Sequence, residues 1–356
     1  MSAAVDAIAL LFVPICLYGA KPAKPLLHTI HPGYLSVREG KCLRGVLSIV
    51  IVLHHLAQKN MGLIVFPMFS KIGYLATSLF FFLSGYGLMI QYIHKENYSC
   101  QFLRRRFPAV FVPYVLATLL CWAIFPLLGT PWTFRDILQG FREGTPIVPG
   151  SWYIICILLF YIAFRLLMWL CGKRYLLMLP GGLVFCGVYI LFCRQMGYGS
   201  WWYNTVPILV LGMAWALFQE KIDGFFTRHS AVAVPGLFLL FVITYGGKIL
   251  LNPYVESDVL HIALTWITTA LFDCCVLLLL MQVKLENPLL HLLGEVSMET
   301  YLCHYLCLML LRSPVIYIQN DCLYILAVLV VSVGVAWVFH RLNGAILRPY
   351  YRWLNR

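Results

Sequence analysis

The chain has 356 residues, of which 62% are hydrophobic and 11% are charged, and its formal net charge is +12 at pH 7. A soluble domain usually has about 45–50% apolar and about 25% charged residues, so the composition excludes a soluble globular protein. Basic cytoplasmic loops explain a positive charge on a membrane protein, so we expect an integral membrane protein with no nucleic-acid partner.

The hydrophobic residues form eleven blocks of roughly 15–22 residues without strict alternation. Such blocks predict helices and exclude an outer-membrane barrel, because a helix satisfies its own backbone groups within each span. We expect an all-α polytopic bundle with about ten core transmembrane helices and one extra N-terminal hydrophobic helix. The blocks lie at residues 3–20, 45–58, 72–91, 109–128, 151–170, 177–193, 203–220, 231–246, 259–280, 294–312 and 322–340.

The first block ends at Lys21 and Pro22, and no basic stretch precedes it. It is therefore a poor cleavable signal peptide. We expect a membrane or interfacial helix with its C-terminal end at the cytoplasm.

The distribution of Lys and Arg predicts the orientation of the bundle. If the segment that ends at Arg44 is cytoplasmic and every later block spans, the inner stretches hold 18 of these residues and the outer stretches hold 7. This asymmetry follows the positive-inside rule. It places the C-terminal tail in the cytoplasm.

Titratable side chains inside apolar blocks normally face the bundle interior and mark function. At about 1.5 Å per residue, His55 lies about 16 Å and His304 about 15 Å from the inner face, so the two imidazoles reach the same level. His54 and His55 point about 100° apart around the helix, so only one can face a given cavity. The full set is His54, His55, Arg165, Asp273, Glu295, Glu299, His304 and His340.

Two further groups have structural interpretations. Arg165 and Asp273 each lie 14 residues into their blocks, and we expect a buried ion pair between helices. The thirteen cysteines form no C-x-x-C motif and lie mostly in apolar blocks, so we expect small packing residues and no disulfide or metal site.

The run Arg104–Arg106 precedes the block at 109–128 and has two compatible interpretations. One is an anchor on anionic lipid at the inner face. The other is a clamp for cytoplasmic phosphates, which guanidinium groups bind through paired hydrogen bonds.

Six segments resemble, in order, motifs of the acyltransferase-3 family of integral membrane acyltransferases. LRGVLSIVIVLHH resembles the family's R-x10-H motif, with Arg44 and His55 in its two positions. LLGEVSMETYLCHYL resembles its late G-x-x-S-x-x-x-Y-L-x-H motif, which gives Gly294, Ser297, Tyr301 and His304. The other four segments are FFFLSGYGL (80–88), FLRRRFPAVFVPY (102–114), GSWYIICILLFY (150–161) and VPILVLGM (206–213).

Two positions depart from the family's pattern. A second arginine often follows the basic run, where Ala109 or Val110 stands here. Larger members often carry a glutamate where Cys156 stands here, which points to a stand-alone form without a fused extracytoplasmic domain. We therefore divide the chain into an N-terminal helix and cytoplasmic linker (1–37), a membrane acyltransferase domain (38–340) and a short basic cytoplasmic tail (341–356).

The resemblance implies transfer of an acetyl or other small acyl group from cytoplasmic acyl-CoA, usually acetyl-CoA, to a hydroxyl of a cell-envelope sugar or similar acceptor. The expected location is a bacterial cytoplasmic membrane. No metal is expected, and the sequence names no particular sugar, acyl group or oligomeric state. His55 is the expected general base, because a neutral imidazole can take a proton from an acceptor hydroxyl. His54 is instead expected to be packed or bonded to the backbone.

The remaining motif residues receive roles on the same basis. Arg44 is expected to hold a phosphate or the thioester region at the cytoplasmic mouth. His304 and Tyr301 are expected to orient the acceptor or to stabilise the developing oxyanion. Glu299 is expected to orient a histidine or to contact substrate, and Ser297 to contact substrate. The expected donor-binding set is Arg44, Arg104, Arg105, Arg106, Ser84 and Tyr86, with the last two lining the pantetheine path.

Two alternatives stay open at this stage. Intramembrane His, Glu and Asp are also typical of a proton-coupled transporter of a small polar solute, although no inverted repeat is visible. Direct acylation of a histidine, followed by relay to the acceptor, is the alternative to single-step transfer.

Overall fold

The computed structural model describes residues 2–23, 29–31, 33–59, 61–251 and 258–355, and 81% of the structure is helical. Two short strands, β1 (Ala20–Pro22) and β2 (Val283–Leu285), pair in antiparallel fashion. The helices are α1 (Ser2–Leu17), α2 (Val37–Ala57), α3 (Val65–Met68), α4 (Gly73–His94), α5 (Tyr98–Ile124), α6 (Phe134–Glu143), α7 (Trp152–Cys171), α8 (Met178–Gln195), α9 (Ile208–Leu251), α10 (Asp258–Gln282), α11 (Pro288–Glu295), α12 (Ser297–Leu311) and α13 (Asp321–Leu354).

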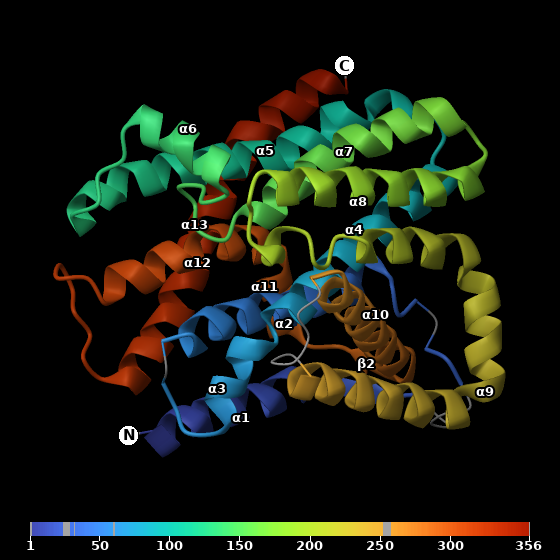
Figure 1. Cartoon of the computed structure of the whole chain (residues 1–356), viewed down its shortest axis with the longest axis horizontal. Coiled ribbons are helices and arrows are strands. Elements are labelled where there is room, and N and C mark those ends of the chain that lie inside the picture. The colour runs from blue at the N-terminus through green and yellow to red at the C-terminus, as the bar shows by residue number, and fades with distance from the viewer. Residues whose placement is uncertain (1, 24–28, 32, 60, 252–257, 356) are drawn as a thin grey trace.

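The all-α polytopic fold predicted from the sequence is confirmed. Among the described residues, eight helices are long and apolar enough to cross a membrane. The expected count was higher because α1 and α12 are shorter than a full span, and because α9 covers two of the expected blocks. Figure 1 shows α5, α7 and α8 lying side by side in one half of the bundle.

Helix α9 accounts for the largest difference from the expected pattern. The blocks at 203–220 and 231–246 predicted two spans, whereas α9 is one continuous helix of 44 residues. A straight helix of this length would measure ~66 Å, about twice the ~30 Å hydrocarbon core of a bilayer. Figure 1 shows that α9 instead bends at the right-hand edge and returns beside α10, so no straight part of it has this full length.

Close backbone contacts fix two helix crossings. A Cβ added at Gly45 of α2 would lie 2.1 Å from the carbonyl oxygen of Leu290 in α11, so only glycine fits there. A Cβ at Gly85 of α4 would lie 1.9 Å from the carbonyl oxygen of Leu209 in α9. Small residues let membrane helices approach this closely. The two motif-bearing helices, α2 and α4, are therefore held against their neighbours without intervening side chains.

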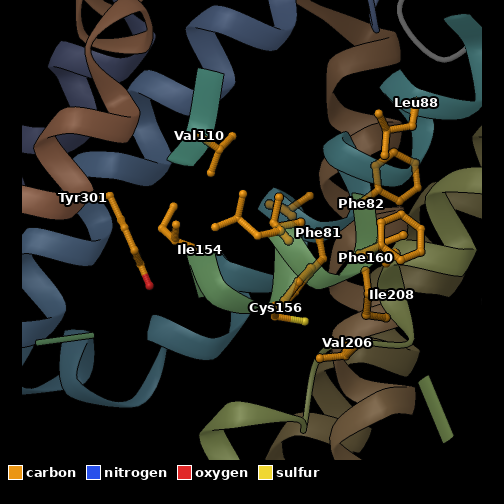
Figure 2. Close-up of a cluster of buried hydrophobic side chains, with 14 of the residues drawn as sticks. Phe81, Phe82, Leu88, Val110, Ile154, Cys156, Phe160, Val206, Ile208 and Tyr301 are labelled. Atoms are coloured by element: carbon orange, nitrogen blue, oxygen red, sulfur yellow. The ribbon is translucent and has the colours of Figure 1, made fainter. Parts of the chain in front are cut away.

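The largest core cluster joins α4, α5, α7, α9 and α12. Phe81, Phe82 and Phe160 are fully buried in it. Figure 2 shows Tyr301 at one edge of this cluster, with Ile154 as its labelled neighbour. On the outside of the bundle large apolar side chains are exposed, for example Val330 at 71%, as expected for a surface that faces lipid.

Helix α1 is attached to the bundle at both of its ends. The carboxylate of Asp6 accepts hydrogen bonds from the backbone N–H groups of Ile64 and Phe66 at the start of α3. At the other end, the Asn287 side-chain amide donates to the Ile15 carbonyl over 2.7 Å. The N-terminal helix thus lies along the bundle from the α3 end to the β1–β2 end.

The β1–β2 pair adds to the attachment at the C-terminal end of α1. Lys21 and Lys284 both form ion pairs with Glu286, and these hydrogen bonds lower the pKa of that carboxyl to about 2. The pairing was not expected, because a three-residue strand has no hydrophobic pattern of its own.

Candidate active site

Two cavities enter the bundle from opposite ends and share the side chain of Tyr301. The inner cavity, about 600 Å³, is the one lined by Arg44, on the side that the Lys and Arg count assigns to the cytoplasm. The outer cavity, about 810 Å³, is the one lined by His55. Helix α2 contributes to both, because Arg44 and His55 lie 11 residues apart on it.

Cations line the inner cavity, and no Asp or Glu is among its described lining residues. These cations are Arg44, Lys95 and Arg106, from α2, the end of α4 and α5. The guanidinium of Arg44 makes no hydrogen bond or ion pair within the described part of the chain. A half-buried, unpaired guanidinium is suited to an anionic ligand such as a phosphate.

The deeper wall of the inner cavity carries hydroxyl groups. The Ser84 hydroxyl donates to the Phe80 carbonyl over 2.8 Å and lies 3.1 Å from the hydroxyl of Tyr153. The Tyr86 hydroxyl donates to the Gln219 side chain over 2.8 Å, and Ser297 also lines this wall. The expected Ser84, Tyr86 and Ser297 are thus brought together, and this mixed apolar and hydroxyl surface suits a flexible amide chain.

The outer cavity has a different lining. No Lys, Arg, Asp or Glu lies among its described lining residues, whereas indole and phenol rings are frequent. The indole side chains are Trp132, Trp152, Trp201 and Trp202. Such rings offer broad apolar faces together with single polar groups.

His55 projects into the outer cavity from the last turn of α2. Its Nδ1 lies 3.1 Å from Oε1 of Gln58. Its ring stacks on His304 at 5.2 Å with an interplanar angle of 27°, and it meets Tyr305 edge-on at 5.2 Å. Nε2 makes no hydrogen bond in the described residues, so this nitrogen is the one free for a ligand.

His304 is buried behind His55. Its Nδ1 lies 2.8 Å from the carbonyl oxygen of Tyr301 and 3.1 Å from that of Thr300, so Nδ1 carries the hydrogen and donates. Its Nε2 is fully buried without a hydrogen-bond partner among the described residues. The two imidazoles meet at one level, as the depth estimate predicted. In this tautomer, however, His304 has no free N–H to offer an oxyanion.

Tyr301 forms the wall between the two cavities. Its hydroxyl donates to the carbonyl of Gly150, just before α7. Its ring meets that of Tyr153 at 5.7 Å, and both rings line the inner cavity. A ligand that extends from one cavity to the other must pass this tyrosine.

A third cavity, about 460 Å³, adjoins the inner cavity at the basic run. Arg105 and Arg106 line it together with Tyr351 from the end of α13. The hydroxyls of Tyr350 and Tyr351 donate to the carbonyls of Arg104 and Arg105, which ties the C-terminal tail to α5. Arg106 lines both the inner and the third cavity, whereas Arg104 is exposed and lines neither.

Glu299 lies apart from all three cavities. Its buried carboxylate accepts hydrogen bonds from Nδ1 of His340 at 2.9 Å and from the amide of Asn343 at 3.0 Å, both on α13. It therefore contacts a histidine, but this is neither His55 nor His304. A contact between Glu299 and substrate stays a prediction.

The prediction of an ion pair between Arg165 and Asp273 is wrong. Asp273 is fully buried, and its Oδ1 lies 2.7 Å from the hydroxyl of Ser78 in α4. The reason is helix order: α10 packs on α4 and α9, whereas the helix of Arg165, α7, packs on α5 and α8. Equal depth in two helices did not make them neighbours.

Sequence reasoning missed several residues at this site. Gln58 was considered only as a helix boundary, although it follows His54 by four residues and His55 by three, the spacing of neighbours on one helix face. Tyr153 and Tyr305 stand next to motif residues but were not singled out. The tryptophans of the outer cavity come from three separate segments, so no local pattern could have grouped them. Trp132 lies in a loop, Trp152 begins α7, and Trp201 and Trp202 lie in a short 3-10 turn.

Comparison with known proteins gives one match. A family model described as an acyltransferase domain matches residues 41–341, a range that includes Arg44, His55 and His304. No curated protein matches the chain, and no solved structure matches it.

Proposed function

The chain belongs to the acyltransferase-3 family of membrane acyltransferases, and from that membership we propose that it moves an acetyl or other small acyl group from cytoplasmic acyl-CoA to a hydroxyl acceptor. The observation that carries the proposal is the meeting of two chemically different cavities at Tyr301, beside the free Nε2 of His55. A proton-coupled transporter is the weaker candidate, because the family match covers most of the chain.

The inner cavity supports an acyl-CoA donor. Coenzyme A combines negatively charged phosphates with a pantetheine arm that ends in the thioester. Arg44 and Arg106 would bind phosphate at the cavity's mouth, and the wall of Ser84 and Tyr86 would take the arm. The third cavity, with Arg105 and Tyr351, would hold the nucleotide end. Arg104 is assigned to the anionic lipid surface as well as to donor steering.

The outer cavity supports an uncharged acceptor. Aromatic faces suit the apolar C–H surface of a sugar ring, and the absence of charged residues from the described lining disfavours a phosphorylated or acidic sugar. We therefore propose a neutral sugar of the cell envelope, or a similar neutral alcohol, as the acceptor. The protein would lie in a bacterial cytoplasmic membrane with its C-terminal tail in the cytoplasm.

The proposed chemistry is a single transfer step. Nε2 of His55 takes the proton from the acceptor hydroxyl as its oxygen attacks the thioester carbonyl. The carbon–sulfur bond breaks, and the CoA thiolate leaves and takes up a proton. Tyr301, at the shared wall, would donate to the developing oxyanion by turning its hydroxyl away from the Gly150 carbonyl, to which it donates in the structure. His304 supports the ring of His55 by stacking, and its Nδ1 hydrogen goes to the Tyr301 carbonyl and not to the oxyanion.

The test uses the purified full chain in lipid nanodiscs. Acetyl-CoA is supplied with a panel of neutral and acidic sugars, and both free thiol and acetylated sugar are measured. We expect thiol release that depends on a neutral acceptor. Failure to consume acetyl-CoA or longer acyl-CoA with any acceptor would overturn the proposal, whereas a transporter would leave the thioester intact. Mass spectrometry of envelope glycans from cells with and without the protein would then identify the acceptor.

A further inference from the structure

Three side chains at the end of α2 form a continuous hydrogen-bonded chain. Nδ1 of His54 lies 2.9 Å from the carbonyl oxygen of Phe69, in a short 3-10 turn before α4. Nε2 of His54 lies 3.2 Å from the amide nitrogen of Gln58, and the amide oxygen of Gln58 lies 3.1 Å from Nδ1 of His55. The chain thus leads from a backbone carbonyl to the candidate base.

Only one arrangement of hydrogens satisfies this chain when both histidines are neutral. A carbonyl oxygen can only accept, so Nδ1 of His54 donates to Phe69 and Nε2 of His54 becomes an acceptor. The Gln58 amide N–H must therefore face His54, which turns the Gln58 oxygen toward His55. Nδ1 of His55 then carries a hydrogen and donates it. Nε2 of His55 is left with its lone pair directed into the outer cavity.

A second observation is that the imidazole of His54 packs tightly against the first residue of α4. A Cβ added at Gly73, the first residue of α4, would lie 2.5 Å from Cδ2 of His54 and 2.6 Å from its Nε2. Any larger residue at position 73 would therefore displace the imidazole. The start of α4 thus packs against the imidazole of His54, including Nε2, the atom that bonds to Gln58.

We propose that His54 and Gln58 are positioning residues that hold His55 in the tautomer with its hydrogen on Nδ1, so that Nε2 serves as the base. The inference rests on the proposed function, because it assumes that His55 takes the acceptor's proton. Without these hydrogen bonds, the neutral imidazole of His55 can place its hydrogen on Nε2, where it blocks proton uptake. His54 then acts through Gln58. Both histidines line the outer cavity, so the expectation that only one of them faces a given cavity is wrong.

The experiment compares two replacements of Gln58 in nanodisc-reconstituted full chain. Gln58→Met keeps the length of the side chain but removes both hydrogen bonds. Gln58→Glu keeps an oxygen that accepts from Nδ1 of His55. We expect Gln58→Met to lower kcat about tenfold or more with the KM for acetyl-CoA nearly unchanged, since general-base catalysis is lost and the inner cavity is intact. Gln58→Glu retains most of kcat.

Gly73→Ala provides a second arm that leaves His55 and Gln58 chemically unchanged. Since Gly73 lines the outer cavity, the KM for the sugar is measured together with kcat, and a positioning role predicts that this KM stays near the wild-type value. We expect kcat to fall because the new methyl group displaces His54. Gly187→Ala in α8 is its control, since an added Cβ there meets no atom within 4 Å and the residue lines none of the three cavities. Gly187→Ala should keep wild-type kcat.

Each outcome decides between two different failures. Equal kcat in Gln58→Met and Gln58→Glu, or wild-type kcat in Gly73→Ala, would overturn the positioning role while the proposed function stands. Wild-type turnover in His55→Ala would instead overturn the assignment of the base. An unchanged KM for acetyl-CoA and normal membrane insertion report that each variant is folded.

Discussion

The two cavities on either side of Tyr301 have similar sizes but opposite linings. The inner cavity, at about 600 Å³, has three cations in its wall, and the outer cavity, at about 810 Å³, has four tryptophans and no charged residue among those described. A cationic wall selects anions, whereas an aromatic wall selects neutral ligands with apolar faces. Under the proposed function, this difference would separate the donor from the acceptor by chemistry, with one tyrosine between them.

A single helix sets the distance between these two environments. Arg44 and His55 lie on α2, about 16 Å apart at the helical rise. Gly45, next to Arg44, packs directly on the backbone of α11, so this end of α2 has little freedom to move. A donor bound at Arg44 must therefore extend most of this length to bring its reacting end to His55, and a pantetheine arm can do so.

Replacement of the outer-cavity imidazole is expected to have the largest effect. His55→Ala should lower kcat by about 10²- to 10⁴-fold, because the general base is removed. The KM for acetyl-CoA should stay near the wild-type value, since His55 does not line the inner cavity. His229→Ala, an exposed histidine on α9, is the control. A large rise in donor KM for His55→Ala would mean that the two cavities are not separate in function.

Replacement of the inner-cavity arginine should act mainly on the donor. Arg44→Ala is expected to raise the KM for acetyl-CoA about tenfold to 100-fold, because a hydrogen bond to a charged group contributes about 1.5–3 kcal/mol. The KM for the sugar should not change. Steady-state kinetics with each substrate varied in turn provides the measurement. An unchanged donor KM with a lost rate would place Arg44 at the reacting carbonyl and contradict the division.

The aromatic wall should affect the acceptor alone, and by a smaller factor. Trp201→Ala is expected to raise the KM for the sugar about threefold to tenfold, since an aromatic contact contributes about 0.5–1.5 kcal/mol. Trp169→Ala is the matched control, because Trp169 is 70% exposed on α7 and lines none of the three cavities. Equal effects of the two variants on sugar KM would argue against an acceptor site in the outer cavity.

The sequence was sufficient for those parts of the molecule that depend on local patterns. Apolar blocks predicted the helices, and helical rise predicted that His55 and His304 reach one level, which their ring stacking at 5.2 Å agrees with. Gly85 and Gly294 were found within motif segments, and both lie at close backbone crossings.

The sequence was insufficient wherever helix neighbours decide the outcome. Asp273 bonds to Ser78 because α10 packs on α4, and no block length or depth carries that information. The segment between the blocks at 203–220 and 231–246 was expected to be a loop. It is instead helical, because a helix can bend there and the hydrophobic pattern does not distinguish a bend from a loop. Gln58 belongs to the site because it bonds to His54 and His55, four and three residues before it. A search for charged residues does not consider a glutamine at this spacing.

The smallest expected effect separates the arginines that the sequence treated as equal. Arg106 lines both the inner and the third cavity, whereas the exposed Arg104 lines neither, although its carbonyl holds Tyr350. We expect Arg106→Ala to raise the KM for acetyl-CoA about threefold to tenfold and Arg104→Ala less than about twofold, because exposed charges contribute little.

The donor acetyl-pantetheine, which lacks the nucleotide, tests the difference between Arg106 and Arg104 more directly. Arg106→Ala should affect its KM less than that of acetyl-CoA, because the phosphates that Arg106 would contact are missing. Arg104→Ala should not distinguish the two donors. If instead Arg104→Ala weakened acetyl-CoA as much as Arg106→Ala did, the whole basic run would act as one electrostatic surface. The donor would then be recognised before it enters either cavity.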